Sequence, residues 1–142
     1  MRAAIDFGLR QLGVQAGPVL LSGQSRGGFL SIVYAGLHPE EVLGVISFVG
    51  GWSADWCDGA FNTRTLAAAG ARCRKPQLWL HDEKDSYYGV SHVQENFAAF
   101  TQAGGQAALH ILSDEPGNDH QLARHPGCWT ELAASYLRGL VK

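Results

Sequence analysis

The sequence is poor in cysteine and carries almost no net charge, and both scarcities exclude classes of protein. Its 142 residues include three cysteines, none of them in a C-x-x-C pair. We therefore expect no zinc site and three independent thiols, with a Cys57 to Cys73 bridge only if the protein is exported. The formal net charge is -2, which indicates neither a nucleic-acid footprint nor a polybasic membrane patch. The partner that we expect is a small molecule.

Long apolar runs are also lacking. The longest, such as residues 43–49, fall far short of the roughly 20 residues that a membrane helix needs. Residues 1–14 have no signal-peptide pattern, so we expect a soluble protein of undetermined compartment. With 46% hydrophobic and 17% charged residues, the chain has the composition and size of one folded domain.

Helical and strand patterns alternate along the chain. Apolar residues at helical spacing predict helices over about 2–14, 26–38, 63–69, 91–103 and 129–140. Continuous apolar runs predict strands over 18–22, 44–49, 77–81 and 107–112. Gly70 is expected to cap the third helix. This alternation predicts an α/β fold, a parallel sheet of about four strands with helices on both faces, whose ligands bind at the C-terminal ends of the strands.

The strongest local signal is Gly23-Gln24-Ser25-Arg26-Gly27, between the first expected strand and a helix. This G-x-S-x-G pattern is typical of a sharp turn that exposes a serine nucleophile. The N–H of Arg26 would then point at negative charge that develops on a substrate, which makes it the expected oxyanion-hole donor. An ordinary turn or helix-capping serine is the alternative interpretation.

A serine nucleophile needs a base, and the base needs a carboxylate to orient it. Asp85 follows the third expected strand and His120 follows the fourth. Both would therefore lie with Ser25 at the C-terminal end of the sheet. We predict these three residues to be catalytic. Asp82, at the strand end, is the alternative acid, and His125, in the last loop, is the alternative base.

The remaining histidines and aromatic residues have lesser expected roles. Among the histidines, His38, His92 and His110 are expected to be structural or exposed, and His81 to pack or hydrogen-bond beside the acid loop. Five aromatic residues are candidates to line an acyl or ring-binding pocket above the serine: Trp52, Trp56, Phe61, Tyr87 and Tyr88. We predict Trp52, Tyr87 and Tyr88 to bind substrate, and loop packing is the alternative role for such aromatic residues. The chain has no metal-binding or phosphate-cradling motif, so we expect no cofactor.

Four stretches resemble the dienelactone hydrolase-like family of the α/β-hydrolases, in its serine-nucleophile branch. They are residues 19–28, 46–52, 76–85 and 117–120, and the resemblance spans nearly the whole chain. It implies Ser25 as nucleophile, Asp85 as acid and His120 as base, in the chain order of that superfamily. Dienelactone hydrolases proper carry cysteine at the elbow, so Ser25 implies carboxylic ester or related acyl substrates. Asp82 stands where similar proteins often have glycine.

The resemblance also implies that part of the fold is missing. Several strands precede the elbow in an α/β-hydrolase, and the loop after the third strand supplies one oxyanion-hole N–H. Here one helix precedes the elbow strand, so we expect residues 1–142 to be the C-terminal half of a single, N-terminally truncated domain. Its elbow strand would be a bare sheet edge through which the chain can self-associate.

Two functions from different classes follow. The first is a serine hydrolase that cleaves carboxylic esters through an acyl-enzyme. The second is a non-catalytic fragment or interaction module. A peptidase or an acyltransferase would use the same three residues, because pocket loops rather than the fold decide specificity.

Overall fold

Helices and strands alternate in the computed structural model, which describes residues 1–14, 17–53, 59–113 and 120–140. The elements are α1 (Arg2–Leu12), β1 (Val19–Gln24), α2 (Arg26–Leu37), β2 (Val42–Phe48), α3 (Gly59–Arg72), β3 (Gln77–Asp82), α4 (Val90–Gln102), β4 (Ala107–Leu112) and α5 (Pro126–Leu140). Two short 3₁₀ helices, η1 (Pro39–Glu41) and η2 (Leu122–Arg124), precede β2 and α5. The predicted order of one helix followed by four strand-helix units is confirmed.

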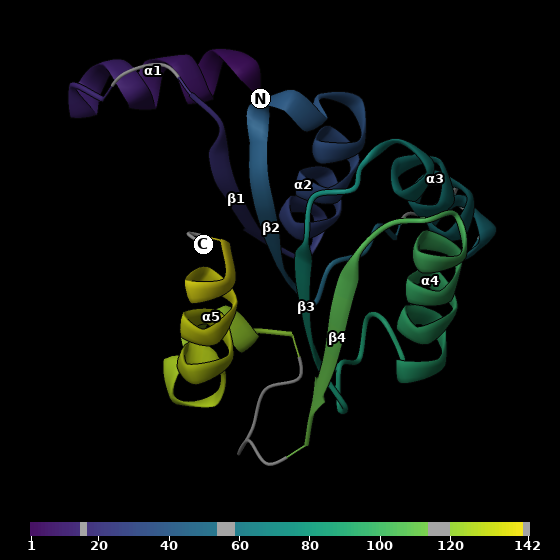
Figure 1. Ribbon diagram of the computed structural model, residues 1–142. Coiled ribbons are helices and arrows are strands. Elements are labelled where there is room, and N and C mark those ends of the chain that lie inside the picture. The colour runs from purple at the N-terminus through teal and green to yellow at the C-terminus, as the bar shows by residue number, and fades with distance from the viewer. Residues whose placement is uncertain (15–16, 54–58, 114–119, 141–142) are drawn as a thin grey trace.

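The four strands form one parallel sheet in the order β1-β2-β3-β4. Each strand therefore pairs with the next strand in sequence, as in Ser22 with Ile46 and Ser47 with Trp79. Helices α2, α3 and α4 cover one face, and α5 covers the other (Figure 1). The predicted α/β class is confirmed. The C-terminal ends of all four strands lie at the same end of the sheet, where loops can bring side chains together.

Alternate residues of the central strands point into two separate cores. Val45 and Trp79 pack with α2, α3 and α4 in one core, whose other members include Phe29, Leu66 and Phe100. Ile46 and Leu80, the next residues along their strands, pack on the other face with Leu122 and Ala133. A strand buried on both faces explains why β2 and β3 read as unbroken apolar runs.

The expected cap at Gly70 is wrong, because α3 continues to Arg72. Gly70 is buried, and a Cβ at this position would lie 2.2 Å from the carbonyl oxygen of Phe100 in α4. The glycine therefore allows the backbones of α3 and α4 to approach each other rather than ending a helix. Helix α3 also begins at Gly59, earlier than the apolar pattern predicts.

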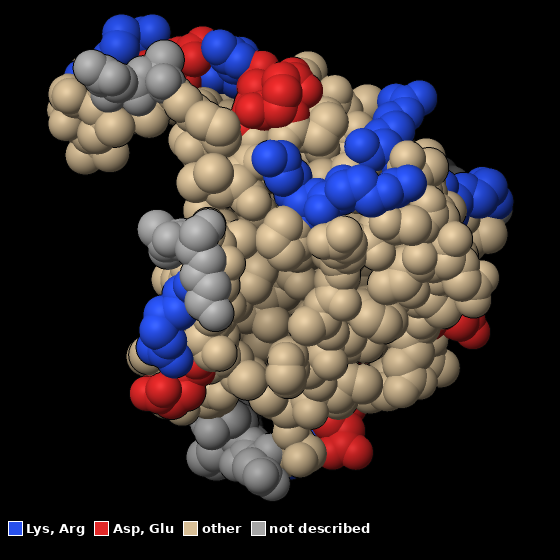
Figure 2. All heavy atoms as spheres, in the orientation of Figure 1, with Lys and Arg blue, Asp and Glu red and all other residues tan. Residues whose placement is uncertain are grey.

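Helix α1 lies beyond the edge strand β1, and Ile5 is its residue that packs against the core under α2, α3 and α4. The helix has no buried residue, and it overhangs the rest of the molecule in both views (Figures 1 and 2). Within the described residues β1 pairs with β2 alone, so its other edge carries no ladder partner there. No helix in the described ranges is both long and apolar enough to cross a membrane.

Candidate active site

The turn between β1 and α2 holds Ser25 in an uncommon backbone conformation. Its φ is 56° and its ψ is -125°, a region that non-glycine residues rarely adopt. The Ser25 N–H donates to the carbonyl of Phe48 (2.9 Å), and its carbonyl accepts from the N–H of Phe29 (3.1 Å). A Cβ on Gly23 would lie 2.3 Å from the Gly27 carbonyl carbon. The local sequence therefore permits the sharp strand-to-helix turn that the motif predicts.

Ser25, His120 and Asp85 form a chain of hydrogen bonds across three loops. His120 Nε2 lies 2.8 Å from Ser25 Oγ, and His120 Nδ1 lies 3.0 Å from Asp85 Oδ2. An ionised carboxylate only accepts hydrogen bonds, so Nδ1 carries the proton and Nε2 is the acceptor for the serine hydroxyl. This is the arrangement in which an imidazole can take a proton from a serine.

Backbone hydrogen bonds hold the Asp85 carboxylate in place. Asp85 is only 6% exposed, and its Oδ1 accepts from the N–H groups of Tyr87 (2.8 Å) and Tyr88 (3.0 Å). The alternative acid, Asp82, is also buried, but its Oδ1 accepts from the Lys84 N–H at 2.8 Å and shapes the turn. The structure thus brings Asp85, rather than Asp82, to the histidine.

His120 reaches Ser25 from the segment between β4 and α5. Gln24, next to the serine, accepts from the N–H of Ala123 at 3.2 Å and ties this segment to the elbow. The Tyr87 ring centroid lies 4.4 Å from that of His120. The alternative base, His125, makes backbone hydrogen bonds at the start of α5, and among the described residues no hydrogen bond joins it to Ser25 or Asp85.

A cavity of about 430 Å³ opens at Ser25. Two of the expected substrate-binding residues, Tyr87 and Tyr88, line it, and the third, Trp52, lines a neighbouring cavity of about 230 Å³. Gln24 and Ser53, which were not predicted from the sequence as site residues, also line the cavity. Gln24 is the variable residue that precedes the serine in the elbow motif, so the motif itself could have indicated that its side chain lies beside Ser25.

Arg26 follows the serine at the start of α2. Its backbone N–H is among the first N–H groups of the helix, for which the helix itself offers no carbonyl acceptor. Its guanidinium donates through Nη2 to the Ser53 carbonyl (3.0 Å) and lies 5.2 Å above the Trp52 ring. The side chain is thereby held at the rim of the Ser25 cavity, which it lines.

Two histidines outside this site have the expected structural roles. His81 donates through Nε2 to the Tyr88 carbonyl at 2.7 Å, and burial lowers the pKa of its ring. His92 Nε2 lies within 3.0 Å of the amide nitrogens of Asn62 and Asn96, which are buried between α3 and α4. The prediction that His81 hydrogen-bonds beside the acid loop is confirmed.

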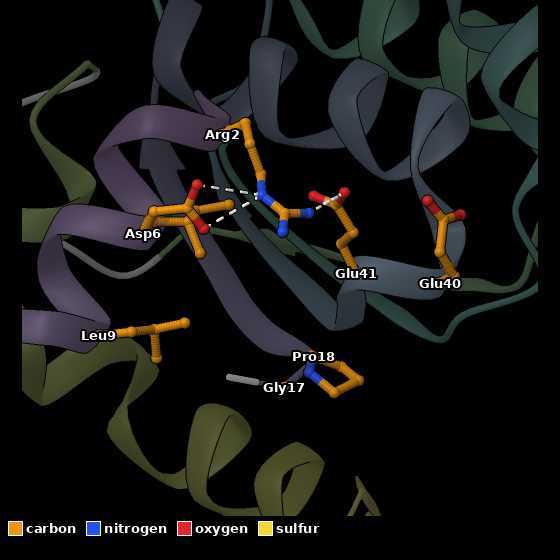
Figure 3. A pocket seen from close by; sticks show the side chains of 8 residues that line it. Arg2, Asp6, Leu9, Gly17, Pro18, Glu40 and Glu41 are labelled. Carbon is orange, nitrogen blue, oxygen red and sulfur yellow. Dashed lines mark hydrogen bonds and ion pairs between the residues drawn. The ribbon is translucent and has the colours of Figure 1, made fainter. Parts of the chain in front are cut away.

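Another cavity, of about 280 Å³, lies at the opposite end of the sheet between α1 and η1 (Figure 3). Arg2 bridges its two sides through ion pairs with Asp6 (3.1 Å) and Glu41. Nearby, ligand atoms of His38, Glu40 and Glu41 lie within 4.8 Å of one another. The Glu41 carboxylate already accepts from Arg2 and Tyr34, so we assign no metal to this cluster.

Two sequence-based expectations concern residues 54–58. Trp56 and Cys57 both lie outside the described residues. Cys73 is buried and is a free thiol. Phe61, one of the five aromatic pocket candidates, stacks on Phe29 at a centroid distance of 6.0 Å and packs against the core.

No protein-family model matches the chain, and no curated protein matches it. Its structure is similar to a CIB-like hydrolase from Thermoplasma acidophilum, with TM-score 0.70, 19% identity and coverage of 96% of this chain and 57% of that one. It is similar to esterase PE8, with TM-score 0.66, 24% identity and coverage of 97% and 57%. It is also similar to a dienelactone hydrolase-like protein from Klebsiella pneumoniae, with TM-score 0.65, 17% identity and coverage of 92% and 56%.

These similarities show the α/β-hydrolase fold. The chain spans a little over half the length of each of these three structures. At this level of identity the comparisons establish how the chain is folded, and the chemistry of the site has to be argued from its own residues.

Proposed function

We propose that this chain carries the catalytic residues of a serine hydrolase that acts on carboxylic esters or related acyl substrates. The observation that supports it most is the continuous hydrogen-bonded chain from Asp85 through His120 to Ser25, placed at the strained turn that exposes a nucleophile. Structural neighbours that are hydrolases and esterases support the same class of chemistry.

The proposed reaction begins with attack of Ser25 Oγ on the carbonyl carbon of the substrate. As the Oγ–C bond forms, the hydroxyl proton passes to His120 Nε2, and Asp85 stabilises the resulting imidazolium through Nδ1–H. The negative charge on the former carbonyl oxygen is stabilised by the N–H of Arg26. Collapse of this intermediate breaks the bond to the leaving group, which takes the proton from Nε2, and leaves an ester on Ser25.

Water then completes the cycle. His120 removes a proton from a water molecule, the water oxygen attacks the acyl carbon, and the Oγ–C bond breaks as the proton returns to Oγ. The product is a carboxylic acid, and the three residues return to their starting state. These reaction steps require no metal or organic cofactor.

An alternative is that the chain is a non-catalytic α/β unit or an interaction module. Two observations favour it: the chain spans just over half the length of the three neighbours described above, and β1 has an edge without a partner among the described strands. That edge is the surface through which we propose that the chain self-associates, because unpaired N–H and C=O groups accept another strand. A peptidase or acyltransferase would use the same Ser25, His120 and Asp85.

Reaction with a fluorophosphonate probe tests the proposal. A serine activated by a base attacks phosphorus, whereas an ordinary serine does not, so we expect one label on the peptide that contains Ser25. The control variant is Ser31→Ala, because Ser31 lies on α2 with its hydroxyl donated to the Gly27 carbonyl. Labelling that persists in Ser25→Ala would contradict the proposal.

A further inference from the structure

Tyr87 contacts both the acid and the base of the proposed site. Its backbone N–H donates to Asp85 Oδ1 (2.8 Å). Its ring centroid lies 4.4 Å from that of His120, and the planes of the two rings are 36° apart, so the rings are closer to parallel than to perpendicular. A single residue of the loop between β3 and α4 therefore fixes the carboxylate through its backbone and packs on the imidazole through its side chain.

The Tyr87 ring covers the imidazole toward solvent. Tyr87 is 67% exposed, whereas the side chain of His120 is only 13% exposed. Three other neighbours of the imidazole are less exposed: Ser25 and Asp85, which bond to its two nitrogens, and Tyr88, whose ring centroid lies 5.5 Å away. Among these four neighbours, the Tyr87 ring is the one that separates the imidazole from solvent.

The imidazole beside this ring becomes a cation in the proposed reaction. When Ser25 attacks, its O–H bond breaks and a new N–H bond forms at His120 Nε2, which leaves one positive charge on the imidazole. The face of an aromatic ring is the negative end of its quadrupole and attracts a cation within about 6 Å of the ring centroid. The distance of 4.4 Å is inside that limit. A neutral imidazole has no such charge, so the attraction grows as the proton arrives.

We propose that Tyr87 is a positioning residue that acts through His120: its aromatic face holds the imidazole against Asp85 and stabilises the imidazolium while Ser25 attacks. This role rests on the proposed function of Ser25 as nucleophile, and it goes beyond the substrate contact predicted for Tyr87 from the sequence. The Tyr87 ring itself exchanges no proton. The proton moves only from Oγ to Nε2 and then to the leaving group.

The first test varies the ring and measures the rate of labelling by a fluorophosphonate. Tyr87→Phe keeps the aromatic face and should react at the wild-type rate. Tyr87→Leu keeps an apolar cover without that face and should react about two- to fivefold more slowly, the effect of a cation–π contact at an exposed site. The matched control is Phe7→Leu, which removes an aromatic ring of similar exposure (58%) from α1 and should leave the rate unchanged.

Fluorinated phenylalanines at position 87 separate the charge on the ring face from its shape. Each added ring fluorine withdraws electrons from the face and hardly changes the size of the ring. We therefore expect the labelling rate to fall in steps from phenylalanine to its monofluoro, difluoro and trifluoro forms. Equal rates across this series would overturn the role. The series also replaces Tyr87→Leu if that variant unfolds, as judged by its thermal midpoint.

A trifluoromethyl ketone separates an effect on His120 from a contact with the ligand. Its adduct on Ser25 resembles the transition state and keeps the proton on His120 Nε2, so its Kd should weaken in Tyr87→Leu by about the same two- to fivefold. The corresponding trifluoromethyl alcohol has no carbonyl to be attacked and leaves His120 neutral. Its Kd should be the same in the wild type and Tyr87→Leu. An alcohol Kd weakened as much as that of the ketone would overturn the role, because Tyr87 would then contact the ligand.

The remaining outcomes distinguish the role of Tyr87 from the function of the site. A wild-type chain that is not labelled contradicts the proposed function of Ser25. Labelling of Tyr87→Leu at the wild-type rate overturns the role of Tyr87 alone. A rate for Tyr87→Phe as slow as that of Tyr87→Leu also overturns it, because the hydroxyl rather than the ring face would then be needed.

Discussion

Alanine at Gly23 should destabilise the fold severely, whereas alanine at Gly27, four residues later in the same turn, should stabilise it. A Cβ on Gly23 would lie 2.3 Å from the carbonyl carbon and 2.4 Å from the carbonyl oxygen of Gly27, and 2.7 Å from the nitrogen of Gly28. All three are backbone atoms of the β1–α2 turn, so relief requires the helix to move away from the strand. A Cβ on Gly27 would meet no atom within 4 Å.

The two substitutions should therefore change the free energy of unfolding in opposite directions. Overpacking against side chains that can move costs roughly 1–3 kcal/mol, and because backbone atoms cannot rotate away we expect Gly23→Ala to cost about 3 kcal/mol or more. Gly27→Ala should gain about 1 kcal/mol from helix propensity. In a domain of this size 1 kcal/mol shifts Tm by roughly 2–4 °C. The expected shifts are thus a fall of about 10 °C for Gly23→Ala and a rise of about 3 °C for Gly27→Ala.

Thermal and urea unfolding followed by circular dichroism measures both variants without reference to activity. The reasoning is refuted if Gly23→Ala melts within about 2 °C of the wild type. It is also refuted if Gly27→Ala loses as much stability as Gly23→Ala, because the turn would then reject any side chain for a reason other than the contacts at Gly23.

Three further outcomes are expected. In an assay of p-nitrophenyl ester hydrolysis, His120→Ala should abolish turnover and His125→Ala should retain it. The opposite result would show that His125 is the base. Burial lowers the pKa of His81 in the folded chain, so unfolding takes up a proton and the free energy of unfolding should fall as pH drops below about 6.5. In urea titrations, the free energy of unfolding of His81→Gln should depend less on pH than that of the wild type. Ser22→Lys places a charge on an exposed position of β1 and should weaken self-association in sedimentation, and an unchanged mass distribution would locate the contact elsewhere.

The sheet could be predicted from the sequence because its strands are buried on both faces. Unbroken apolar runs such as 44–49 marked the strands, and the alternation with helices fixed the parallel class. The same logic placed Ser25, Asp85 and His120 at one edge, since each follows a different strand and the C-terminal ends of parallel strands meet. The site could therefore be predicted as a set of residues before any distance was known.

Contacts between elements remote in sequence could not be predicted. Gly70 has the sequence signature of a helix cap, and only the approach of α4 shows that it is a close-contact residue. Leu137 continues the apolar stripe of α5 but is 39% exposed. Val49 adopts a φ of 43° at the end of β2, which no pattern indicates because branched residues rarely do so.

The most direct measurement of the central claim is the covalent intermediate itself. The protein is mixed with a short p-nitrophenyl ester, quenched with acid within the first turnovers and digested for mass spectrometry. The account predicts one acyl group on the peptide that contains Ser25, formed together with a burst of p-nitrophenol of equal amount, and neither signal in Ser25→Ala. An acyl group on another residue, or hydrolysis that continues in Ser25→Ala, would contradict it.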